Sequence, residues 1–489
     1  MLEIDEIKRL IEMDATDPVK RQAKEGCRYY EGEHDIKGYR IFYTDEHGEI
    51  QEDKTRANQR IAHPYFMELC DQQVQYMLSD SDGYIQSDEK ALQEALDDYF
   101  EEDFMGSMHD FLLDVVKCGF GYLYCYKTAD DRIKFEHADA MGVVEVPASD
   151  SSDGRDYVIY HYFDRYDKNN APIVKVQVWD DEQTWYYVKR MDGTLVLDEE
   201  AEINPRPHVV WKAEDETYGE SLGFIPFFRL DNNVKRQSNL KVIKSIIDDY
   251  DLVNCGLSNN IQDYDNPIYA VTGFQGDNLG DLIANLKSKR HIGLDSEGGV
   301  EVKTVDIPYE ARKTKLEIDE RNIYHFGMGL NSNMVGDGNV TNVVIKSRYA
   351  LLDMKCNKLE VRLKRFLRKL LDVVLAEINS KGATEYTQKQ VKLKFSRELM
   401  TNALDNAEIG KYEAETRQLD INTFLSLRSL IGDEETLRLI CEQLDLDFEE
   451  LKKHIPEDPL VMNVGLQNQL NGGEGDEPGG TGNPQPEPE

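Results

Sequence analysis

A heptad repeat of apolar residues between positions 345 and 373 restricts the fold more than any other feature of this sequence. The repeat runs through a stretch without proline, and its apolar positions step alternately by four and three residues: Ile345, Tyr349, Leu352, Cys356, Leu359, Leu363, Phe366, Leu370 and Val373. This spacing places all of these side chains along one side of an α-helix. The sequence therefore predicts a long helix whose apolar seam is buried against other helices.

The same helix concentrates positive charge in an otherwise acidic chain. Residues 343 to 370 contain nine basic residues against Asp353 and Glu360, a local charge of +7, whereas the whole chain has a formal net charge of −37. The basic residues are Lys346, Arg348, Lys355, Lys358, Arg362, Lys364, Arg365, Arg368 and Lys369. Two interpretations stay open: they neutralise acidic neighbours in an oligomer or surround a buried seam, or they contact the phosphates of a nucleic acid. The acidic outer surface itself should not attract nucleic acid.

A segment rich in glycine and asparagine, FGMGLNSNMVGDGNVTN, stands directly before this helix. Its glycines provide backbone freedom and its asparagines offer neutral polar contacts. These residues are Gly329, Gly336, Gly338, Asn331, Asn333, Asn339 and Asn342. Asp337 would repel phosphate, so the GDGN stretch is weak evidence for a phosphate-binding nest. We expect a mobile loop at the head of a rigid helix.

The remaining patterns predict an α+β protein. Two to four structural units are expected, because 489 residues exceed what one core can hold. Helices are expected at 1–30, 54–80, 88–118, 238–263 and 308–325, with Ser238 as an N-cap and Pro308 in a first turn. Strands are expected in a hairpin-like region at 29–50, from about 119 to 210, in a small excursion at 268–306 and in LKFSREL at 393–399. Residues 402–455 suggest three short amphipathic helices, and the end of the chain suggests a disordered acidic tail.

Sequence motifs that carry catalysis are missing. There is no G-x-x-x-x-G-K-[ST] loop, no G-x-G-x-x-G after a strand and no G-x-S-x-G elbow. Acidic runs such as Glu101-Glu102-Asp103 and Asp248-Asp249 are read as solvated surface. The ten histidines show no metal-ligand spacing, so no catalytic residues, no cofactor and no bound metal are expected. A binding or structural protein is favoured over an enzyme.

Cysteine usage and the N-terminal sequence indicate the compartment. The seven cysteines are scattered and form no C-x-x-C pair, which argues against a disulfide framework and for a reducing environment. The sequence MLEIDEIKRLIEMDATD is charged throughout and lacks the apolar core of a signal peptide. No run approaches the roughly 18 apolar residues of a membrane helix. A soluble intracellular product without a membrane partner is expected.

Four stretches together resemble the portal proteins of tailed bacteriophages, of the siphovirus type. They are YYEGEHDI at 29–36, GFIPFFRLDNN at 223–233, SIIDDYDLVNCGLSNNIQDYDNPIYAVTG at 245–273 and NVTNVVIKSRYALLDMKCNKLEVRLKRFLRKLL at 339–371. The resemblance implies a virion protein at the portal vertex of the capsid, assembled in the host cytoplasm into a dodecameric ring around double-stranded DNA. It also implies docking to the terminase large subunit, a head-completion or adaptor protein, and the major capsid and scaffolding proteins. The chain would then serve DNA packaging and ejection.

The resemblance further implies a division of the chain: 1–235 an α/β wing, 236–267 a stem helix, 268–306 a small β-containing clip, 307–327 a second stem helix and 328–343 a tunnel loop. Residues 344–400 would be the long, kinked wing helix and a strand, 401–457 a helical crown and 458–489 the acidic tail.

Candidate contact residues follow from the same resemblance. For the DNA-facing tunnel loop they are Asn331, Asn333, Met334, Val335, Asp337 and Asn339, followed by Lys346 and Arg348. For the stem channel they are Lys313 and Lys315, and for partner binding by the clip they are Lys287, Lys289 and Arg290. The alternative is a cytosolic, metal-dependent DNA-processing enzyme such as a nuclease, which would need acidic residues converging at one site. A non-portal oligomeric scaffold would share the heptad helix but would not need the loop.

Overall fold

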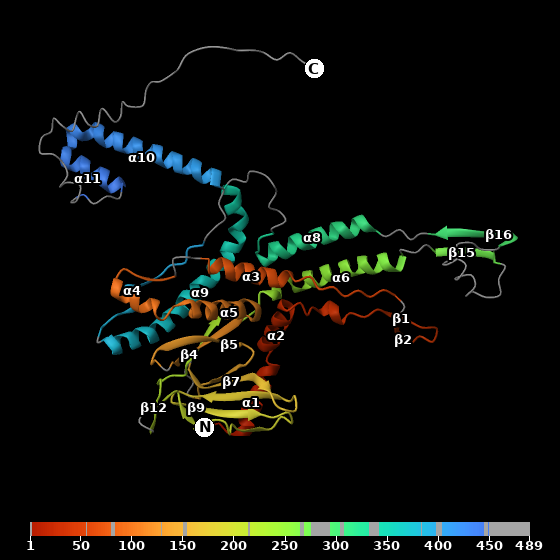
Figure 1. Cartoon of the computed structure of the whole chain (residues 1–489). Helices are drawn as coiled ribbons and strands as arrows, with labels where there is room; N and C mark the ends of the chain where they lie inside the picture. Colours follow the sequence, from red (N-terminus) through yellow and green to blue (C-terminus); the bar gives the residue numbers. More distant parts are fainter. Residues whose placement is uncertain are drawn as a thin grey trace, which may run out of the picture. The chain divides into compact units, whose positions relative to one another are not determined.

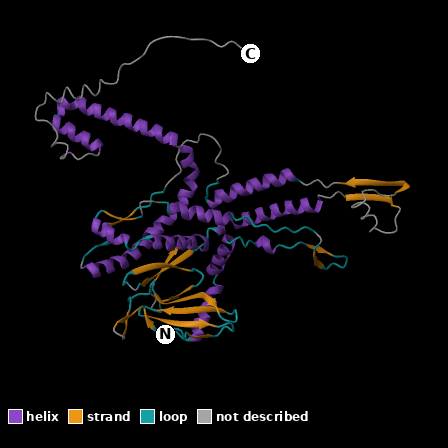
Figure 2. Cartoon of the chain, viewed as in Figure 1, coloured by secondary structure: helices purple, strands orange, loops and turns teal. Residues whose placement is uncertain are grey.

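A computed structural model describes residues 2–54, 56–79, 84–128, 130–149, 154–213, 216–264, 268–274, 294–303, 308–331, 342–382, 384–397, 403–444 and 448. The chain divides into two compact units, residues 1–400 and 401–489. Helices and strands alternate through the first unit (Figures 1 and 2), so the α+β prediction is confirmed for the described part of the chain.

The chain begins with two helices, α1 (Ile4–Thr16) and α2 (Pro18–Tyr30), where the sequence predicted one. The break falls at Asp17, whose side chain accepts a hydrogen bond from Val19 N at 2.7 Å. Pro18 has no N–H to continue the first helix and suits the first position of the second. A short 3-10 helix, η1 (Asp35–Gly38), and the hairpin of β1 (Phe42–Thr44) and β2 (Ile50–Glu52) follow, so the hairpin prediction is confirmed.

Three further helices and a small sheet form the middle of the first unit. They are α3 (Tyr65–Met77), α4 (Lys90–Asp97), α5 (Glu102–Cys118) and the pair β3 (Ile85–Ser87) with β17 (Val391–Leu393). The predicted continuous helix at 88–118 is therefore interrupted, because the turn after α4 directs the Phe100 ring toward Phe104 and Phe135. The strand predicted at 393–399 also lies earlier than expected, since only Leu393 of that stretch belongs to β17.

Two antiparallel sheets make up the β-rich section. The three-stranded sheet has the order β14 (Phe227–Asp231), β4 (Phe120–Lys127), β5 (Ile133–Ala138). The six-stranded sheet has the order β10 (Leu195–Leu197), β9 (Gln183–Lys189), β8 (Pro172–Trp179), β7 (Arg155–Tyr166), β6 (Val143–Pro147), with β11 (Arg206–Pro207) also paired to β9. A separate hairpin joins β12 (Val209–Ala213) to β13 (Glu216–Glu220).

Long helices complete the first unit. They are α6 (Leu240–Tyr264), α8 (Tyr309–Gly327) and α9 (Asn342–Gly382), and β15 (Ile268–Phe274) pairs with β16 (Leu294–Lys303) between the first two. Ser238 Oγ accepts from Leu240 N at 3.1 Å, as an N-terminal cap does. Pro308 stands just before the first helical residue of α8 rather than inside its first turn. A 3-10 turn, η4 (Gln388–Gln390), leads into β17.

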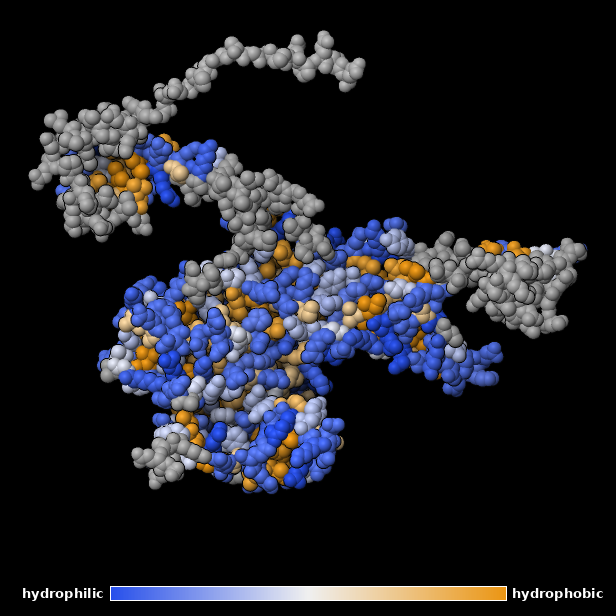
Figure 3. Space-filling view, in the orientation of Figure 1, coloured by the Kyte–Doolittle hydropathy of each residue, from blue (hydrophilic) through white to orange (hydrophobic). Residues whose placement is uncertain are grey.

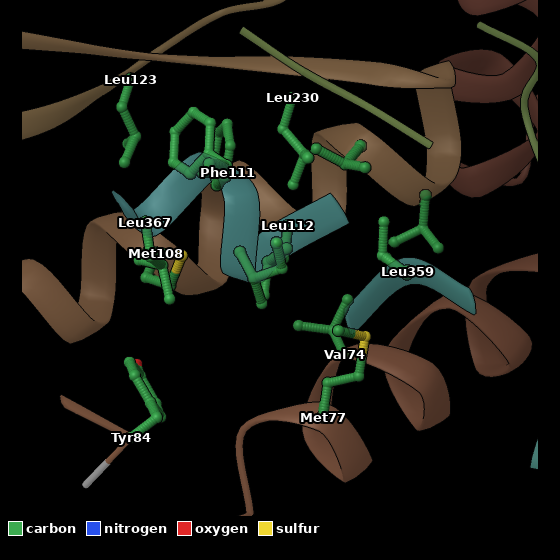
Figure 4. Packing of buried hydrophobic residues seen from close by; sticks show 14 of the residues in the cluster. Val74, Met77, Tyr84, Met108, Phe111, Leu112, Leu123, Leu230, Leu359 and Leu367 are labelled. Atoms are coloured by element: carbon green, nitrogen blue, oxygen red, sulfur yellow. The ribbon is translucent and has the colours of Figure 1, made fainter. Parts of the chain in front are cut away.

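The predicted seam of α9 lies in the main core. Its members Leu352, Cys356, Leu359, Leu363, Phe366 and Leu370 are buried, with Tyr349 and Val373 half-buried beside them. They pack with residues of α3, α5 and β4 (Figure 4), and the Phe111 and Phe366 rings stack with their centroids 4.7 Å apart. The prediction of a long helix with a buried apolar seam is confirmed from Tyr349 to Val373; the side chain of Ile345, the first predicted member, lies outside the described part.

The second unit consists, in its described part, of α10 (Ala403–Ile431) and α11 (Asp433–Leu444). The sequence predicted three short helices between 402 and 455, but 29 residues form the single helix α10. Gly410 lies inside it, because one glycine costs a helix only about 1 kcal/mol and does not end it. The predicted acidic tail at 458–489 lies outside the described residues.

Candidate nucleic-acid interface

Helices α6 and α8 lie side by side (Figure 1) and are joined by an ion-pair cluster. Lys315 on α8 pairs with Asp249 on α6 and, at 2.5 Å, with Asp319 one turn further along its own helix. Asp319 is buried, so its carboxylate depends on this partner. Partial burial lowers the pKa of Lys315, but the hydrogen bonds to Asp249 and Asp319 outweigh this effect and raise it. The ammonium group of Lys315 therefore stays charged and holds the two helices together.

An extended segment, residues 57–63, lies along another side of α6; we call it the strap. The backbone N–H groups of alternate strap residues each donate to one side chain of α6, and the accepting side chains are four residues apart. The pairs are Ala57 N to Asp263 Oδ1 (2.8 Å), Gln59 N to Asn259 Oδ1 (2.6 Å), Ile61 N to Cys255 Sγ (3.2 Å) and His63 N to Asp251 Oδ1 (3.0 Å). Two extended residues advance about 6.6 Å and four helical residues about 6 Å, so the two repeats stay in register.

The end of the strap is fixed by a buried carboxylate. Asp251 is fully buried, and its two oxygens lie 2.7 Å from His34 Nδ1 and 2.7 Å from His63 Nδ1. His34 in turn stacks on Tyr29 at 4.5 Å. Burial raises the pKa of Asp251, but the hydrogen bonds from His34 and His63 outweigh it and hold the pKa below its ordinary value. The N-terminal helices are thereby tied to α6 through a charged, fully bonded group.

Helix α3 holds the point where the chain leaves α8. Met328 takes the left-handed conformation with φ of 55°, which ends the helix. Glycine suits the next position, because a Cβ on Gly329 would lie 2.0 Å from Leu69 Cδ2 and would force that side chain to move. Tyr324 OH donates to Glu68 Oε2 at 2.8 Å, and burial together with this bond raises the pKa of Tyr324. We call residues 327–331 the loop base.

Polar side chains complete the hold on the loop base. Gln72 Oε1 accepts from Leu330 N and Gln72 Nε2 donates to Leu330 O, both at 2.9 Å. Asn331 Nδ2 donates to Glu320 Oε1 at 3.2 Å. From α9, Lys355 Nζ donates to Gly327 O at 2.9 Å, and burial lowers the pKa of this lysine. The segment that follows the loop base is therefore anchored to three helices at its start.

The basic residues of α9 divide into bonded and exposed groups. Lys355 is used by the loop base, and Lys364 pairs with Glu360 at 2.7 Å. Lys346 is exposed and Arg348 half-buried. Two acidic residues of the helix also receive a cation from outside it, because Arg397 bonds to Asp353 at 2.6 Å and also to Glu360. An acidic neighbour within the same chain thus accounts for Lys364, whereas neutralisation of acidic neighbours in an oligomer stays a prediction.

The sequence-predicted contact residues have the following places. Asn331 belongs to the loop base, Lys346 and Arg348 lie in the first turns of α9, and Lys313 is exposed on α8. Lys315 is engaged between α6 and α8. The remaining predicted residues lie outside the described part of the chain: Asn333, Met334, Val335, Asp337, Asn339, Lys287, Lys289 and Arg290.

Sequence reasoning missed the residues that hold this region in place. Gln72, Leu69 and Glu68 are more than 250 positions from the loop base, and nothing in their own surroundings in the sequence points to it. Asp251 and Asn259 did carry a signal. With Cys255 and Asp263 they form a stripe at four-residue spacing that repeats along α6.

Within the ranges given above, no three His, Cys, Asp or Glu side chains lie together as metal ligands would. Nor does any described helix have the length and apolar character needed to cross a membrane. A hollow of about 1180 Å³ in the β-rich section is lined by aromatic side chains such as Tyr124 and Trp179 and by charged ones such as Lys127, Glu136 and Arg206.

Comparison with known proteins identifies the family. Residues 14–456 match the family model described as "Phage portal protein, SPP1 Gp6-like". The portal protein of Bacillus phage SPP1 is 25% identical over 402 residues, which cover 81% of this chain and 77% of that protein. The portal protein of Clostridium phage phiCD119 is 25% identical over 424 residues, covering 84% of this chain and 89% of that protein. The nuclease alternative finds no support in these comparisons. The chain belongs to the phage portal protein family and is a structural, non-enzymatic component of the virion.

Proposed function

We propose that identical copies of this chain assemble into a dodecameric ring in which α6 and α8 line a channel for double-stranded DNA. The observation that carries this assignment is the pairing of two long helices, bridged by Lys315, with a β-hairpin at one end and an anchored loop base at the other. This arrangement suits a rigid stem, with residues 268–306 as the clip and 328–343 as the tunnel loop. Residues 1–235 and 344–400 would form the wing, and 401–457 the crown.

Exposed apolar residues on the stem helices support burial against a second copy of the chain. Figure 3 shows hydrophobic side chains gathered over the α6–α8 pair. The exposed apolar residues of these helices are Val242, Leu252, Ile261, Tyr309, Ile318 and Phe326. Contacts between unlike surfaces of identical subunits generate rings when the rotation between neighbours closes, and such contacts would cover exposed apolar side chains of these helices. The neighbouring subunit is the occupant that this surface suits.

The tunnel loop is proposed to contact DNA while the loop base fixes where it starts. Asn331, Asn333, Met334, Val335, Asp337 and Asn339 would offer few charges, so that DNA slides without being held. Lys346, Arg348 and the exposed Lys313 would supply sparse phosphate contacts, whereas Lys315 acts mainly between the helices. The clip residues Lys287, Lys289 and Arg290 would contact the terminase large subunit and, after packaging, the head-completion or adaptor protein. Capsid and scaffolding proteins would contact the wing during assembly in the host cytoplasm.

A deletion tests the role of the loop. Removal of residues 333–339 should leave ring assembly intact and abolish DNA packaging into capsids. A variant in which the same residues are replaced by an equally long glycine–serine stretch separates loop length from loop sequence. Rings of normal size that package DNA normally after the deletion would refute the proposed role, and loss of the ring would show that these residues serve assembly instead.

A further inference from the structure

Two cysteines that are far apart in the sequence meet between α2 and α5. Cys27 Sγ lies 2.8 Å from Cys118 Sγ, and 91 positions separate the two residues. Cys118 is buried, whereas Cys27 is partly exposed. A disulfide bond has a length of about 2.05 Å, so the sulfurs need to approach by only about 0.8 Å more to form one.

The backbone explains why these sulfurs lie so close. A Cβ on Gly26 would stand 1.9 Å from Lys117 O, which means that α2 and α5 are in direct backbone contact beside the two cysteines. Such a contact allows little relative movement of the helices. The Lys117 ammonium, 3.0 Å from Asp114 and over the Tyr30 ring, adds positive charge near both sulfurs. The hydrogen bond to Cys27 and burial raise the pKa of the Cys118 thiol, and the charge of Lys117 offsets this only in part. Cys27, the more exposed of the two, is therefore the sulfur that an external disulfide reaches first.

The other five cysteines have different surroundings. Cys70, Cys125, Cys255, Cys356 and Cys441 are buried, and no hydrogen bond joins any of their sulfurs to another sulfur within the described chain, which includes all seven cysteines. Cys255 accepts from the strap and Cys356 faces Gln73 O. The geometry therefore singles out one pair.

We propose that Cys27 and Cys118 form a redox site that closes to a disulfide when the protein meets a low-molecular-weight disulfide such as oxidised glutathione. The Cys27 thiolate attacks one sulfur of oxidised glutathione and releases one glutathione thiolate. Cys118 then loses its proton to solvent, attacks Cys27 Sγ and displaces the second glutathione. The two cysteines are oxidised by two electrons, and the glutathione disulfide is reduced to two thiols.

The expected consequence is a covalent tie between α2 and α5 that forms after assembly. The pair stays reduced in a reducing cytosol and closes once a virion protein enters an oxidising medium. A cross-link across so long a loop restricts the unfolded chain strongly, which stabilises the fold that holds it. Membership of the portal family enters the proposal only in saying when the disulfide forms. Whether it can form depends on the two cysteines and on the helices that hold them.

Thiol counting on the full-length protein tests the proposal. After incubation with oxidised glutathione, denaturation and alkylation, five of the seven cysteines should react, and reduction should restore all seven. Peptide mapping without reductant should find the Cys27 and Cys118 peptides joined, with the intact mass lower by two hydrogens. The Cys70→Ala variant should also lose two thiols on oxidation. The Cys27→Ser variant, altered at the more exposed partner, should form no internal disulfide.

Three results would overturn the proposal. They are alkylation of all seven cysteines after oxidation, a cross-link that joins Cys27 to Cys70, and loss of two thiols in Cys27→Ser. Because the measurement uses purified protein and no ring or DNA, its failure leaves the portal assignment untouched.

Discussion

The side-chain amide of Gln72 bonds to both the N–H and the C=O of Leu330, each at 2.9 Å. One side chain of α3 thereby fixes the direction in which the chain leaves α8. A side-chain amide can do this because its NH2 group donates while its oxygen accepts. The loop base is therefore held by a specific pair of bonds in addition to packing, and its position can be tested by single substitutions.

Replacing Gln72 with alanine should loosen the loop base. Each half-buried hydrogen bond contributes about 0.5–1.5 kcal/mol, so the variant should lose about 1–3 kcal/mol of stability and its segment 328–341 should be cut faster by protease. Urea unfolding followed by tryptophan fluorescence measures the first effect, since Trp179, Trp185 and Trp211 all belong to the first unit. Gln51→Ala, at an exposed hairpin position, is the control and should change stability by less than about 0.5 kcal/mol. Equal losses in both variants would argue against a specific hold by Gln72.

Gly329→Ala should move the loop base because its new methyl group meets Leu69. The Cβ would lie 2.0 Å from Leu69 Cδ2, and such overpacking costs about 1–3 kcal/mol. Leu69→Ala alone leaves a cavity and costs about 2–5 kcal/mol. In the double variant the methyl group occupies part of that cavity, so the combined loss should be smaller than the sum of the single losses. Additive losses would show that the two residues are not in contact.

Asp251→Ala should be the most damaging substitution along the strap. It leaves His34 and His63 without their shared carboxylate, and breaking a buried pair in this way costs about 3–5 kcal/mol. Asp263→Ala, at the other end of the strap, removes one hydrogen bond of a half-buried carboxylate and should cost about 1–2 kcal/mol. The free energy of unfolding in urea measures both. Similar losses at the two ends would contradict the view that the strap is fixed mainly at Asp251.

The contact between η1 and α6 should weaken in acid. Partial burial raises the pKa of Asp35, but hydrogen bonds from Lys244 and Arg28 outweigh it and lower the pKa to about 2 from 3.8. A lowered pKa stabilises the fold at every pH above the unfolded value, and this contribution is lost as the pH falls through the folded value. The stability difference between the wild type and Asp35→Asn should therefore be full at pH 5 and shrink toward pH 2.

Urea midpoints at several pH values measure this difference. Val234→Ala, at an uncharged and largely exposed position, is the control and should differ from the wild type by the same amount throughout. A difference between the wild type and Asp35→Asn that grows on acidification would contradict the assigned direction.

The sequence could predict those parts of the fold whose burial follows a regular period. The α9 seam was readable because Leu352, Leu359 and Phe366 recur where a helix must bury them. Helix ends were less predictable, because Pro18 and the Phe100 contacts divide helices whose apolar stripes continue across the break. Helix α10 differs in the other direction: short helices were predicted there, but the chain forms one long helix that Gly410 does not interrupt.

The site was less predictable than the fold, for a physical reason. Which basic residues are free depends on partners distant in the sequence: Lys315 is engaged by Asp249, and Lys355 by the carbonyl of Gly327. Local charge patterns predict where cations gather, but they carry no information on which cations are already paired. Lys313 and Lys315 are two positions apart, yet Lys313 is exposed whereas Lys315 is half-buried and paired with Asp249 and Asp319.

Imaging of the purified protein by electron microscopy, with mass from light scattering at several salt concentrations, tests the central claim most directly. The account predicts rings with a central hole wide enough for a DNA duplex and a mass that is twelve times that of the 56.3 kDa chain. Salt should favour assembly, because it screens the repulsion between copies that each carry a net charge of −37. Compact monomers at every salt concentration would contradict the proposal that these surfaces form a ring.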